Sequence, residues 1–445
     1  MLELTLLFCF LLTLLCISFK LFLTDSDAKS PPKSYPFIGH YLSIYTNHHR
    51  LAQWTSDAIH NSHTLTFLLR RPFGQNRVLS GNPAVVQHIL KTKFSTYQKV
   101  DNFRSTLFDL IGDGIFNVDG DKWKFQRQLS SHEFNTKSLR HFVEHVVDDE
   151  LNKRLIPIFT SAAANNTVLD LQNILQRFAL DNICRIAFGY DPAYLTPSLP
   201  QAKFAVAFED AKRLKEAVSE IRQFTTKILN EKKQELTIQP VDLLLRFLNT
   251  GHLDENLVTD IVISFILAGR DTTSAALTWF FWLLHKNPAI ESKVVREIKE
   301  KSDSPVYDEV KDMVYTHASL CESMRLYPPV PVDSKLANAD DVLPDGTVVK
   351  KDGIPTGEVL ENDDAAEKKI FRARDPYVYP VFQAGPRICL GKDMAFLQMK
   401  RVVAGVLRQF KVVPAVDDGR EPVYVAALTS KMKGGFLVKI KERKE

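Results

Sequence analysis

Residues 257–284 restrict the possible folds of this chain more than any other stretch, because they are apolar on nearly every side of a helix. A helix on a protein surface normally keeps one polar face, so this one must be buried along its length. It is therefore expected to run through the centre of a large domain. The rest of the chain is mainly helical in pattern, with short strand-like pieces at 64–69, 77–79, 348–350 and 423–428. The sequence predicts a mainly α fold with small β-sheets.

The chain has 445 residues, enough for one large domain or several ordinary ones. No Gly/Ser-rich linker, repeat or low-complexity block interrupts it after residue 36, which favours a single domain over residues 37–445. The formal net charge of +4 is nearly balanced and gives no reason to expect a nucleic acid or an acidic substrate. The five cysteines include no C-x-x-C pair and are too scattered for a disulfide framework, which indicates a reducing, cytosol-facing environment.

The beginning of the chain is strongly apolar from residue 4 to residue 19, and the apolar stretch resumes at 21–23 after Lys20. About 20 such residues cross a bilayer once, provided that Lys20 reaches the interface. A cleaved signal peptide is the alternative, but no Lys or Arg precedes the apolar run and no small-x-small site clearly follows it. Residues 1–23 are therefore expected to form a single membrane anchor.

The residues after this stretch bear on the orientation of the anchor. Lysines at 20, 29 and 33 lie on its C-terminal side, which places the body of the protein in the cytosol by the positive-inside rule. Residues 24–36 contain three prolines, and this composition predicts a stiff, non-helical connector between the anchor and the domain.

Cys389 is the first candidate functional residue. It stands between two glycines, follows Arg387, and precedes an apolar helical run at 394–406. Backbone N–H groups close to the sulfur and the N-terminus of a helix both favour the thiolate over the thiol. A thiolate held in this way suits the proximal ligand of a haem iron. The alternative is a buried structural cysteine, which is the commonest role of an unpaired thiol.

The long apolar helix contains the second candidate, at Asp271 and Thr272 within the run Ala268-Gly269-Arg270-Asp271-Thr272-Thr273. Charged residues beside hydroxyls in a buried helix are costly unless they have partners or a task. The small residues at 268 and 269 would let a flat ligand or O₂ approach the backbone. Thr272 could hold a water and relay protons, with Asp271 as the next member. The alternative is a helix kink in which threonines bond back to carbonyls.

In two further pairs of residues, the spacing places both side chains on the same side of a helix, where they could act together. Glu322 and Arg325 lie on one helical face, followed at once by Tyr327 and three prolines that end the helix and begin an extended segment. Trp123 and Arg127 are one helical turn apart and point the same way, and an arginine is the natural clamp for a carboxylate.

These motifs, in this order, resemble those of the cytochrome P-450 monooxygenases. Residues 382–391 have the pattern F-x-x-G-x-R-x-C-x-G of that family's haem loop, and 268–273 resemble its oxygen-activating helix. The resemblance implies one large helical domain that binds haem b, with Cys389 as the iron ligand. The other residues that it assigns to the cofactor are Phe382, Gly385, Arg387, Trp123 and Arg127.

The resemblance also implies roles away from the cofactor. Asp271 and Thr272 would relay protons to the reacting oxygen, and the E-x-x-R pair of Glu322 and Arg325 would brace the segment before the haem loop. Gly112 and Gly114 alone are not a dinucleotide fingerprint, so the electrons would come from a separate NADPH-dependent flavoprotein reductase. The expected docking residues for this reductase are Lys122, Lys124, Arg387 and Lys392.

Residues 260–282, 112–117 and 381–385 look like the plant ω-hydroxylase branch of that family, which oxidises fatty acids and, in some members, the jasmonoyl-isoleucine hormone. This likeness implies oxygen insertion at or near the terminal methyl of a carboxylate-bearing chain, by an enzyme held in the endoplasmic reticulum membrane. Four residues are expected in the substrate pocket by their motif positions: Phe103, Phe108, Val330 and Val332.

Two family segments are missing from the sequence. After residue 211 a helix end, a loop and a helix start are absent, so one helix is expected over about 202–236. Between residues 346 and 381 the P-E-R-F/W segment is absent, so Glu322 and Arg325 would lack their third partner and a strand would be lost. A shortened variant that does not hold haem is therefore an alternative. A haem enzyme that rearranges hydroperoxides is another, against which the Asp271–Thr272 pair argues.

Overall fold

We describe the protein from a computed structural model, which describes residues 32–72, 76–134, 136–199, 214–234, 243–249, 254–358, 375–416 and 419–443. These residues fall into two compact units, one from residues 1–98 and 332–360 and the other from 99–331 and 361–445. The predicted anchor at 1–23 lies outside the described residues. Within the described part of the chain, none of the helices has the length and apolarity needed to span a bilayer.

The first unit is built on a five-stranded sheet with the strand order β1-β2-β8-β5-β3. Its strands are β1 (Thr66–Leu69), β2 (Arg77–Ser80), β3 (Tyr97–Lys99), β5 (Val332–Ala337) and β8 (Ile354–Glu358). Strand β2 runs antiparallel to β1 and parallel to β8, and β8 runs antiparallel to β5. Residues 354–358, within the stretch 346–381 where the sequence predicts the loss of a strand, form β8 in the middle of this sheet, and that loss stays a prediction.

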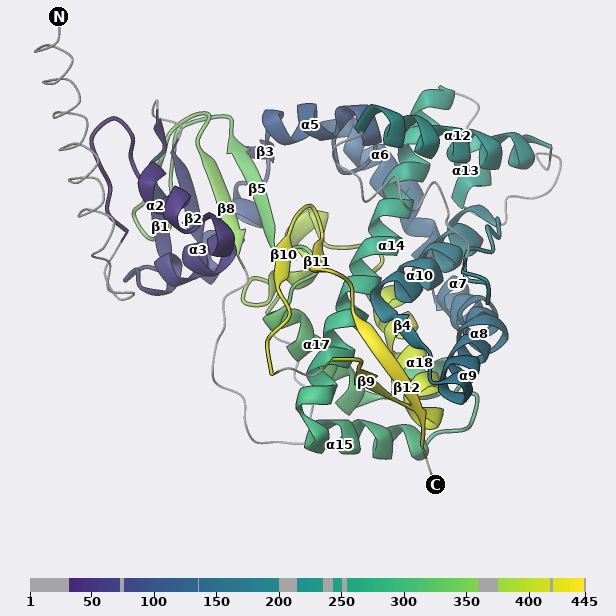
Figure 1. The fold of residues 1–445 in the computed structure, drawn as a ribbon. Helices are drawn as coiled ribbons and strands as arrows, with labels where there is room; N and C mark the ends of the chain where they lie inside the picture. Colours follow the sequence, from purple (N-terminus) through teal and green to yellow (C-terminus); the bar gives the residue numbers. More distant parts are fainter. Residues whose placement is uncertain are drawn as a thin grey trace, which may run out of the picture. The chain divides into compact units, whose positions relative to one another are not determined.

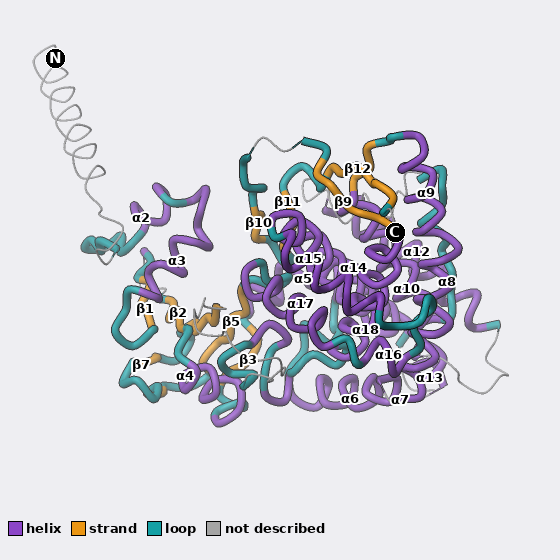
Figure 2. The backbone as a smooth tube through the Cα atoms, turned by 90° about the horizontal axis from the view of Figure 1, so that it is seen from below, coloured by secondary structure: helices purple, strands orange, loops and turns teal. Residues whose placement is uncertain are grey.

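Short helices and a hairpin complete the first unit (Figure 2). They are α2 (Tyr41–Thr46), α3 (Leu51–His60), α4 (Pro83–Gln87) and the hairpin of β6 (Asp341–Val342) with β7 (Val348–Val349). Two small apolar clusters hold them to the sheet. One gathers Trp54 and Ile59 of α3 with Leu69 and Leu79, and the other includes Val78 and Val85.

The second unit contains most of the helices. They are α5 (Asp101–Ile111), α6 (Gly120–Ser131), α7 (Thr136–His141), α8 (Asp148–Glu150), α9 (Ile156–Asn165), α10 (Leu171–Phe188), α12 (Leu214–Lys233), α13 (Leu243–Asn249), α14 (Glu255–Lys286), α15 (Pro288–Lys299), α16 (Tyr307–Lys311), α17 (Val314–Leu326) and α18 (Lys392–Gln409). The predicted helices at 257–284 and 394–406 are confirmed as α14 and α18. Helix α12 covers part of the helix expected over 202–236, and residues 200–213 lie outside the described residues.

Two small sheets lie among these helices. A three-stranded antiparallel sheet joins β4 (Val168–Asp170), β12 (Leu437–Glu442) and β9 (Phe410–Pro414), and β10 (Tyr424–Ala426) pairs with β11 (Ser430–Met432). The predicted strand-like pieces at 64–69, 77–79, 348–350 and 423–428 correspond to β1, β2, β7 and β10. The mainly α fold with small sheets is thereby confirmed.

Helix α14 is buried as its sequence predicts, and it packs on α10 and α17 (Figure 1). Its hydroxyl side chains would be costly in that setting without hydrogen bonds. Four of them bond back to the carbonyl oxygen four residues earlier: Ser264 to Asp260, Thr272 to Ala268, Ser274 to Arg270 and Thr278 to Ser274. These hydroxyls are therefore satisfied within the helix.

Four aromatic rings fix the end of α17 against α14. The rings of Trp279 and Tyr327 stack with their centroids 4.0 Å apart, and Trp282 and Tyr424 pack around them. The Tyr424 hydroxyl donates a hydrogen bond to the Pro328 carbonyl oxygen at 2.7 Å. The helix ends at Leu326 as predicted from the prolines, and aromatic packing then directs the chain that leaves it.

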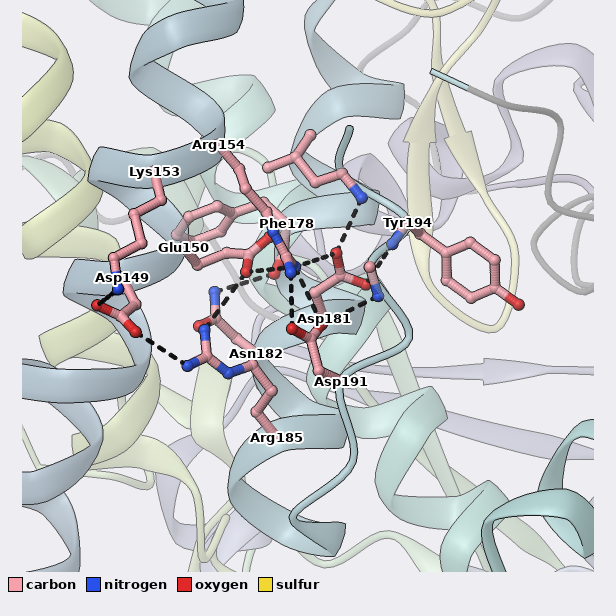
Figure 3. Close-up of polar contacts among 12 residues, drawn as sticks. Asp149, Glu150, Lys153, Arg154, Phe178, Asp181, Asn182, Arg185, Asp191 and Tyr194 are labelled. Carbon is pink, nitrogen blue, oxygen red and sulfur yellow. Dashed lines mark hydrogen bonds and ion pairs between the residues drawn. The ribbon is translucent and has the colours of Figure 1, made fainter. Parts of the chain in front are cut away.

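A buried charge network joins α8 to α10 and to the loop that follows α10 (Figure 3). The carboxyl groups of Glu150 and Asp181 are fully buried, and the Arg154 Nη1 atom lies 2.9 Å from the first and 3.3 Å from the second. Arg154 also binds Asp191, while Asp181 accepts the backbone N–H of Leu195 at 2.8 Å. Burial and the neighbouring Asp181 raise the pKa of Glu150 to about 8. Glu150 therefore carries a proton near neutral pH.

We expect this proton to make stability depend on pH. The pKa of Glu150 is about 8 in the folded protein against an ordinary value of 4.5, so the folded state binds more protons between these values and loses stability as the pH rises through them. The free energy of unfolding should fall by roughly 1–3 kcal/mol across this window from this group. In Glu150→Gln the fall should be smaller, because only the neighbouring Asp181, whose pKa burial also raises, still contributes to it from this network. Urea denaturation of both proteins in detergent at several pH values measures it, and equal slopes would contradict the assignment.

Candidate active site

The loop that carries Cys389 lies just before α18. Two short 3-10 helices, at Pro380–Phe382 and Gly385–Arg387, turn the chain, with Gly385 at a φ of 66° that favours glycine. The Cys389 N–H then donates to the Phe382 carbonyl oxygen at 2.8 Å. The Phe382 ring packs on Phe396 of α18 at a centroid distance of 5.1 Å. These contacts place the cysteine at the N-terminus of a long, buried helix.

The sulfur of Cys389 is reachable from solvent but crowded by protein. The residue is exposed, and the Gly391 backbone N–H donates a hydrogen bond to the sulfur. Desolvation by the surrounding protein nevertheless raises the pKa of the thiol, against the opposing influence of Gly391, Arg127 and Lys392. The thiolate expected from the sequence therefore stays a prediction, for the state in which the sulfur binds a metal. A metal ligand at this position would have to lose its proton on binding.

Arg387 connects the cysteine loop to α6. Its Nη2 atom donates to the Asp119 carboxylate at 2.5 Å and to the Val118 carbonyl oxygen at 2.9 Å. Its guanidinium also lies over the Trp123 ring, 4.6 Å from the centroid. Only 10% of the Arg387 side chain is exposed. The structure thus brings the predicted Arg387 and Trp123 together, but it leaves Arg387 little surface for docking a reductase.

Arg127 lies one helical turn after Trp123, in a different environment from Arg387. It is half-buried on α6, and neither a hydrogen bond nor an ion pair is found for it within the described part of the chain. Burial lowers the pKa of its guanidinium, while the nearby Cys389 raises it. A partly desolvated cation without a protein anion beside an exposed cysteine suits a ligand with acidic groups.

The middle of α14 presents one open face. Between Val258 and Trp282, the residues that are partly exposed are Ala268, Gly269 and Thr272, which share one side of the helix. A Cβ atom at Gly269 would lie 2.6 Å from Ile183 of α10. This glycine therefore permits close packing of two helices, and the ligand approach expected from the sequence stays a prediction.

Asp271 points to a different place from Thr272. Its carboxylate is buried, lies 3.2 Å from the Arg270 Nη1 atom, and lines a narrow gap with Gln176 of α10 and Ser430 of β11. Neighbouring residues on a helix do not face each other. A relay that includes Asp271 and Thr272 would therefore need a group between them, and the two roles stay a prediction.

The E-x-x-R pair is intact on α17. The Nε and Nη2 atoms of Arg325 donate to the two Glu322 carboxylate oxygens at 2.9 and 2.7 Å. The Glu322 side chain is 58% exposed, whereas the Arg325 side chain is only 17% exposed. The Nη1 atom of Arg325 is buried and finds no hydrogen-bond acceptor among the described residues, so the predicted cost of the missing third partner stays a prediction.

The four expected pocket residues are not gathered by any contact that the structure shows. Phe108 on α5 and Val330 are exposed in the second unit, and Val332 is exposed on β5 of the first. Phe103 lies on α5, but its side chain is outside the described residues. Their assignment to a substrate pocket stays a prediction.

Sequence reasoning missed the residues that hold the loop before α6. Asp260 of α14 accepts the Asp113 backbone N–H at 3.0 Å and binds Arg222 of α12 at 2.8 Å. A Cβ atom at Gly112 would lie 2.0 Å from the Asp260 carboxylate, so the glycine permits this contact. Gly112, Asp113 and Asp260 lie in stretches that carry the family resemblance, but no role was predicted for either aspartate or for Arg222. An aspartate in an apolar helix was the signal that could have pointed to the contact.

The residues present fit a haem. They supply one exposed thiol that receives an N–H hydrogen bond, and a half-buried arginine on the neighbouring helix without a protein anion within the residues described. A thiolate ligand and a carboxylate clamp are the two functions that haem b requires from a protein of this kind.

Comparison with known proteins agrees with this fit. The family model described as Cytochrome P450 matches residues 30–207, 197–354 and 363–439. The chain belongs to the cytochrome P450 family. It is 55% identical over 465 positions to Cytochrome P450 94A1 of Vicia sativa, covering 93% of this chain and 90% of that relative. It is 40% identical to Cytochrome P450 94B1 of Arabidopsis thaliana, covering 94% and 92%. The predicted haem cofactor and monooxygenase class are thereby confirmed.

The comparison also agrees with the two missing segments. The matched stretches of the P450 model meet at residues 197–207 and break at 354–363, close to the two predicted sites. The alignment with Cytochrome P450 94B3 of Arabidopsis thaliana is 500 positions long, more than the 445 residues of the chain, so that relative has positions without a counterpart here.

We predict that Asp119 stabilises the cysteine loop through Arg387. In Asp119→Asn the charge is removed while the amide oxygen can still accept the Lys99 N–H that Asp119 binds at 3.1 Å. Leaving Arg387 without its anion should cost about 1–3 kcal/mol and lower both the thermal midpoint and the haem bound per chain. Asp121→Asn is the matched control, because the Asp121 side chain is 99% exposed on the same helix. Equal midpoints and equal haem content in the two variants would contradict this role.

Proposed function

We propose that the protein is a membrane-anchored monooxygenase that hydroxylates fatty acids, or a fatty-acid-derived hormone conjugate, at or near the terminal methyl carbon. The observation that carries the proposal is a complete cysteine loop on a chain 55% identical to Cytochrome P450 94A1. The resemblance of residues 260–282 to the plant ω-hydroxylase branch supports the substrate class and the position of attack.

Bound at the Cys389 sulfur, haem supplies the redox and oxygen chemistry of the reaction. Cys389 would hold the iron, with the Gly391 N–H directed at the sulfur. Arg127 would pair with a haem propionate from α6. Arg387 would keep the loop in place through Asp119, and Phe382 would pack between the loop and α18.

Thr272 and Asp271 would relay protons to the reacting oxygen. The Thr272 hydroxyl donates to the Ala268 carbonyl oxygen at 2.6 Å, so its own lone pairs remain available on the partly exposed face of α14. Asp271 would supply the proton from the interior, through a water or a hydroxyl that bridges the two side chains.

The electrons would come from a separate NADPH-dependent flavoprotein reductase. Lys122 and Lys124 are exposed on α6, although each is paired with an aspartate at 2.7 and 3.2 Å. With Lys392 they would form the docking face, from which Arg387 is excluded by its burial. Residues 1–23 would anchor the protein in the endoplasmic reticulum membrane with the catalytic part in the cytosol, as the flanking lysines favour.

The first test is product analysis. Full-length protein, reductase and NADPH are incubated with fatty acids of different chain length, and mass spectrometry locates the hydroxyl group. We expect hydroxylation at the terminal carbon or its neighbour, and none with Cys389→Ala. Attack in the middle of the chain would contradict the proposed position. Turnover of a fatty hydroperoxide without reductase would instead support the rearrangement alternative.

A second test concerns Thr272. In Thr272→Val the hydroxyl is replaced by a methyl of similar size, and product formed per NADPH consumed should fall by on the order of 10²-fold. Thr272→Ser should retain most of the yield. Thr278→Val is the matched control, since Thr278 makes the same backbone hydrogen bond at 2.7 Å on a fully buried part of α14. A similar loss of yield in both valine variants would contradict a proton-relay role.

A further inference from the structure

Two histidines lie one helical turn apart on the outer side of the segment before α8. His141 is the last residue of α7, and His145 lies in the π-helical turn Phe142–Val147 that follows it. Both residues are exposed, and the centroids of their rings are 4.8 Å apart. Within the described residues, neither imidazole makes a hydrogen bond or an ion pair. The nitrogen atoms of both rings are therefore available to a ligand.

The separation of the two rings suits one shared metal ion. Bonds of about 2.1 Å from a metal to each imidazole place the two nitrogen atoms roughly 3–4 Å apart. Rings whose centroids are 4.8 Å apart reach this distance by rotating about their side-chain bonds, which exposed side chains do freely. No backbone movement is needed.

The core holds the segment that carries the pair. Phe142 is 1% exposed and Val147 is fully buried, and both belong to the main apolar cluster of the second unit. The π-helical turn also packs on α18, the helix that follows Cys389. The two imidazoles therefore extend from a fixed backbone, so a ligand that binds both of them orders little more than the two side chains.

The charges around the pair favour a bound cation. Burial and the neighbouring His145 lower the pKa of His141, which keeps its imidazole in the neutral form that binds metals. Arg140, the cation next to His141 in the chain, is neutralised by Glu144 at 3.3 Å and by Asp308 at 3.0 Å. Repulsion between this arginine and a metal ion at the pair is therefore reduced.

The sequence of the segment has the pattern H-x-x-E-H over residues 141–145, a spacing that places zinc ligands on one side of a helix. In hydrolytic zinc sites on helices, a glutamate beside the ligands acts as the general base. Here Glu144 is engaged elsewhere, because its Oε1 atom binds Arg140 and accepts the Tyr307 backbone N–H at 3.1 Å. Across the described ranges, no group of three possible ligands is found. The pair therefore suits metal binding, with water in the remaining positions, rather than hydrolysis.

We propose that His141 and His145 together bind one divalent transition-metal ion of the kind that prefers imidazole, such as Zn²⁺. The ion would link the end of α7 to the π-helical turn that packs on α18. With two protein ligands and water elsewhere, it would exchange with the solvent, unlike the ion of a closed structural site. The pair shares no residue with the cysteine loop, so the proposal depends neither on haem nor on turnover.

Isothermal titration of Zn²⁺ into the full-length protein in detergent tests the proposal. The protein is purified without a polyhistidine tag, and the variants are His141→Ala, His145→Ala and His145→Gln, the last of which keeps a polar side chain. His60→Ala is the matched control, because His60 is also exposed at the end of a helix, α3, and no ring contact is found for it in the described part of the chain. Zinc bound by cysteines is common to all of these proteins, so the differences between them report on the pair.

We expect a zinc site in the wild-type protein whose affinity falls on the order of tenfold or more in each of the three variants of the pair, because the second imidazole binds at a high effective concentration. His60→Ala should bind zinc as the wild type does, and excess Mg²⁺, which prefers oxygen ligands, should not compete. Unchanged affinity in His141→Ala and His145→Ala would overturn the proposal, as would a wild-type protein that binds no zinc. Because the readout is metal binding, failure of the proposed hydroxylation is a separate result.

Discussion

The ion pair between Arg387 and Asp119 is the interaction on which the arrangement of the candidate active site depends. It ties the loop before Cys389 to the start of α6, at an Nη2–Oδ1 distance of 2.5 Å. Since Arg387 also covers Trp123, one guanidinium sets the position of the cysteine relative to the helix that carries Arg127. Both arginines were expected to bind the cofactor. Arg387 instead ties the cysteine loop to α6, whereas Arg127 remains for a ligand.

The connections around the loop explain how a shortened P450 can keep its site. The Tyr379 hydroxyl donates to the Cys321 carbonyl oxygen of α17 at 2.7 Å, and Phe382 packs on Phe396 of α18. Burial beside Cys321 raises the pKa of Tyr379 far above its ordinary value, so this hydroxyl keeps its proton for the bond. In the first unit, β8 occupies the centre of the sheet, at the second break in the family match. The loop is therefore held by contacts to α6, α17 and α18 that do not involve the missing P-E-R-F/W segment.

Local pattern predicted the long helices, and the resemblance to a known family supplied most of the candidate residues. The apolar run at 257–284 predicted α14, the prolines after Tyr327 predicted the end of α17, and the glycines around Cys389 predicted its loop. What could not be predicted are partners far apart in the chain: Asp119 and Arg387 are separated by 268 residues, and no spacing rule connects them. Gly269 shows the same limit. A small residue in a helix suits a ligand or a neighbouring helix equally well, and its close approach to Ile183 of α10 could not be predicted from the sequence.

The central claim is that Cys389 binds haem iron in this chain despite the two missing segments. The most direct measurement is the CO-difference spectrum of the reduced full-length protein, expressed in membranes with haem supplied. The account predicts a thiolate-type Soret band that disappears in Cys389→Ala. A featureless spectrum, with the protein present in normal amount, would contradict it and would show that the chain keeps the motifs of a P450 without its cofactor.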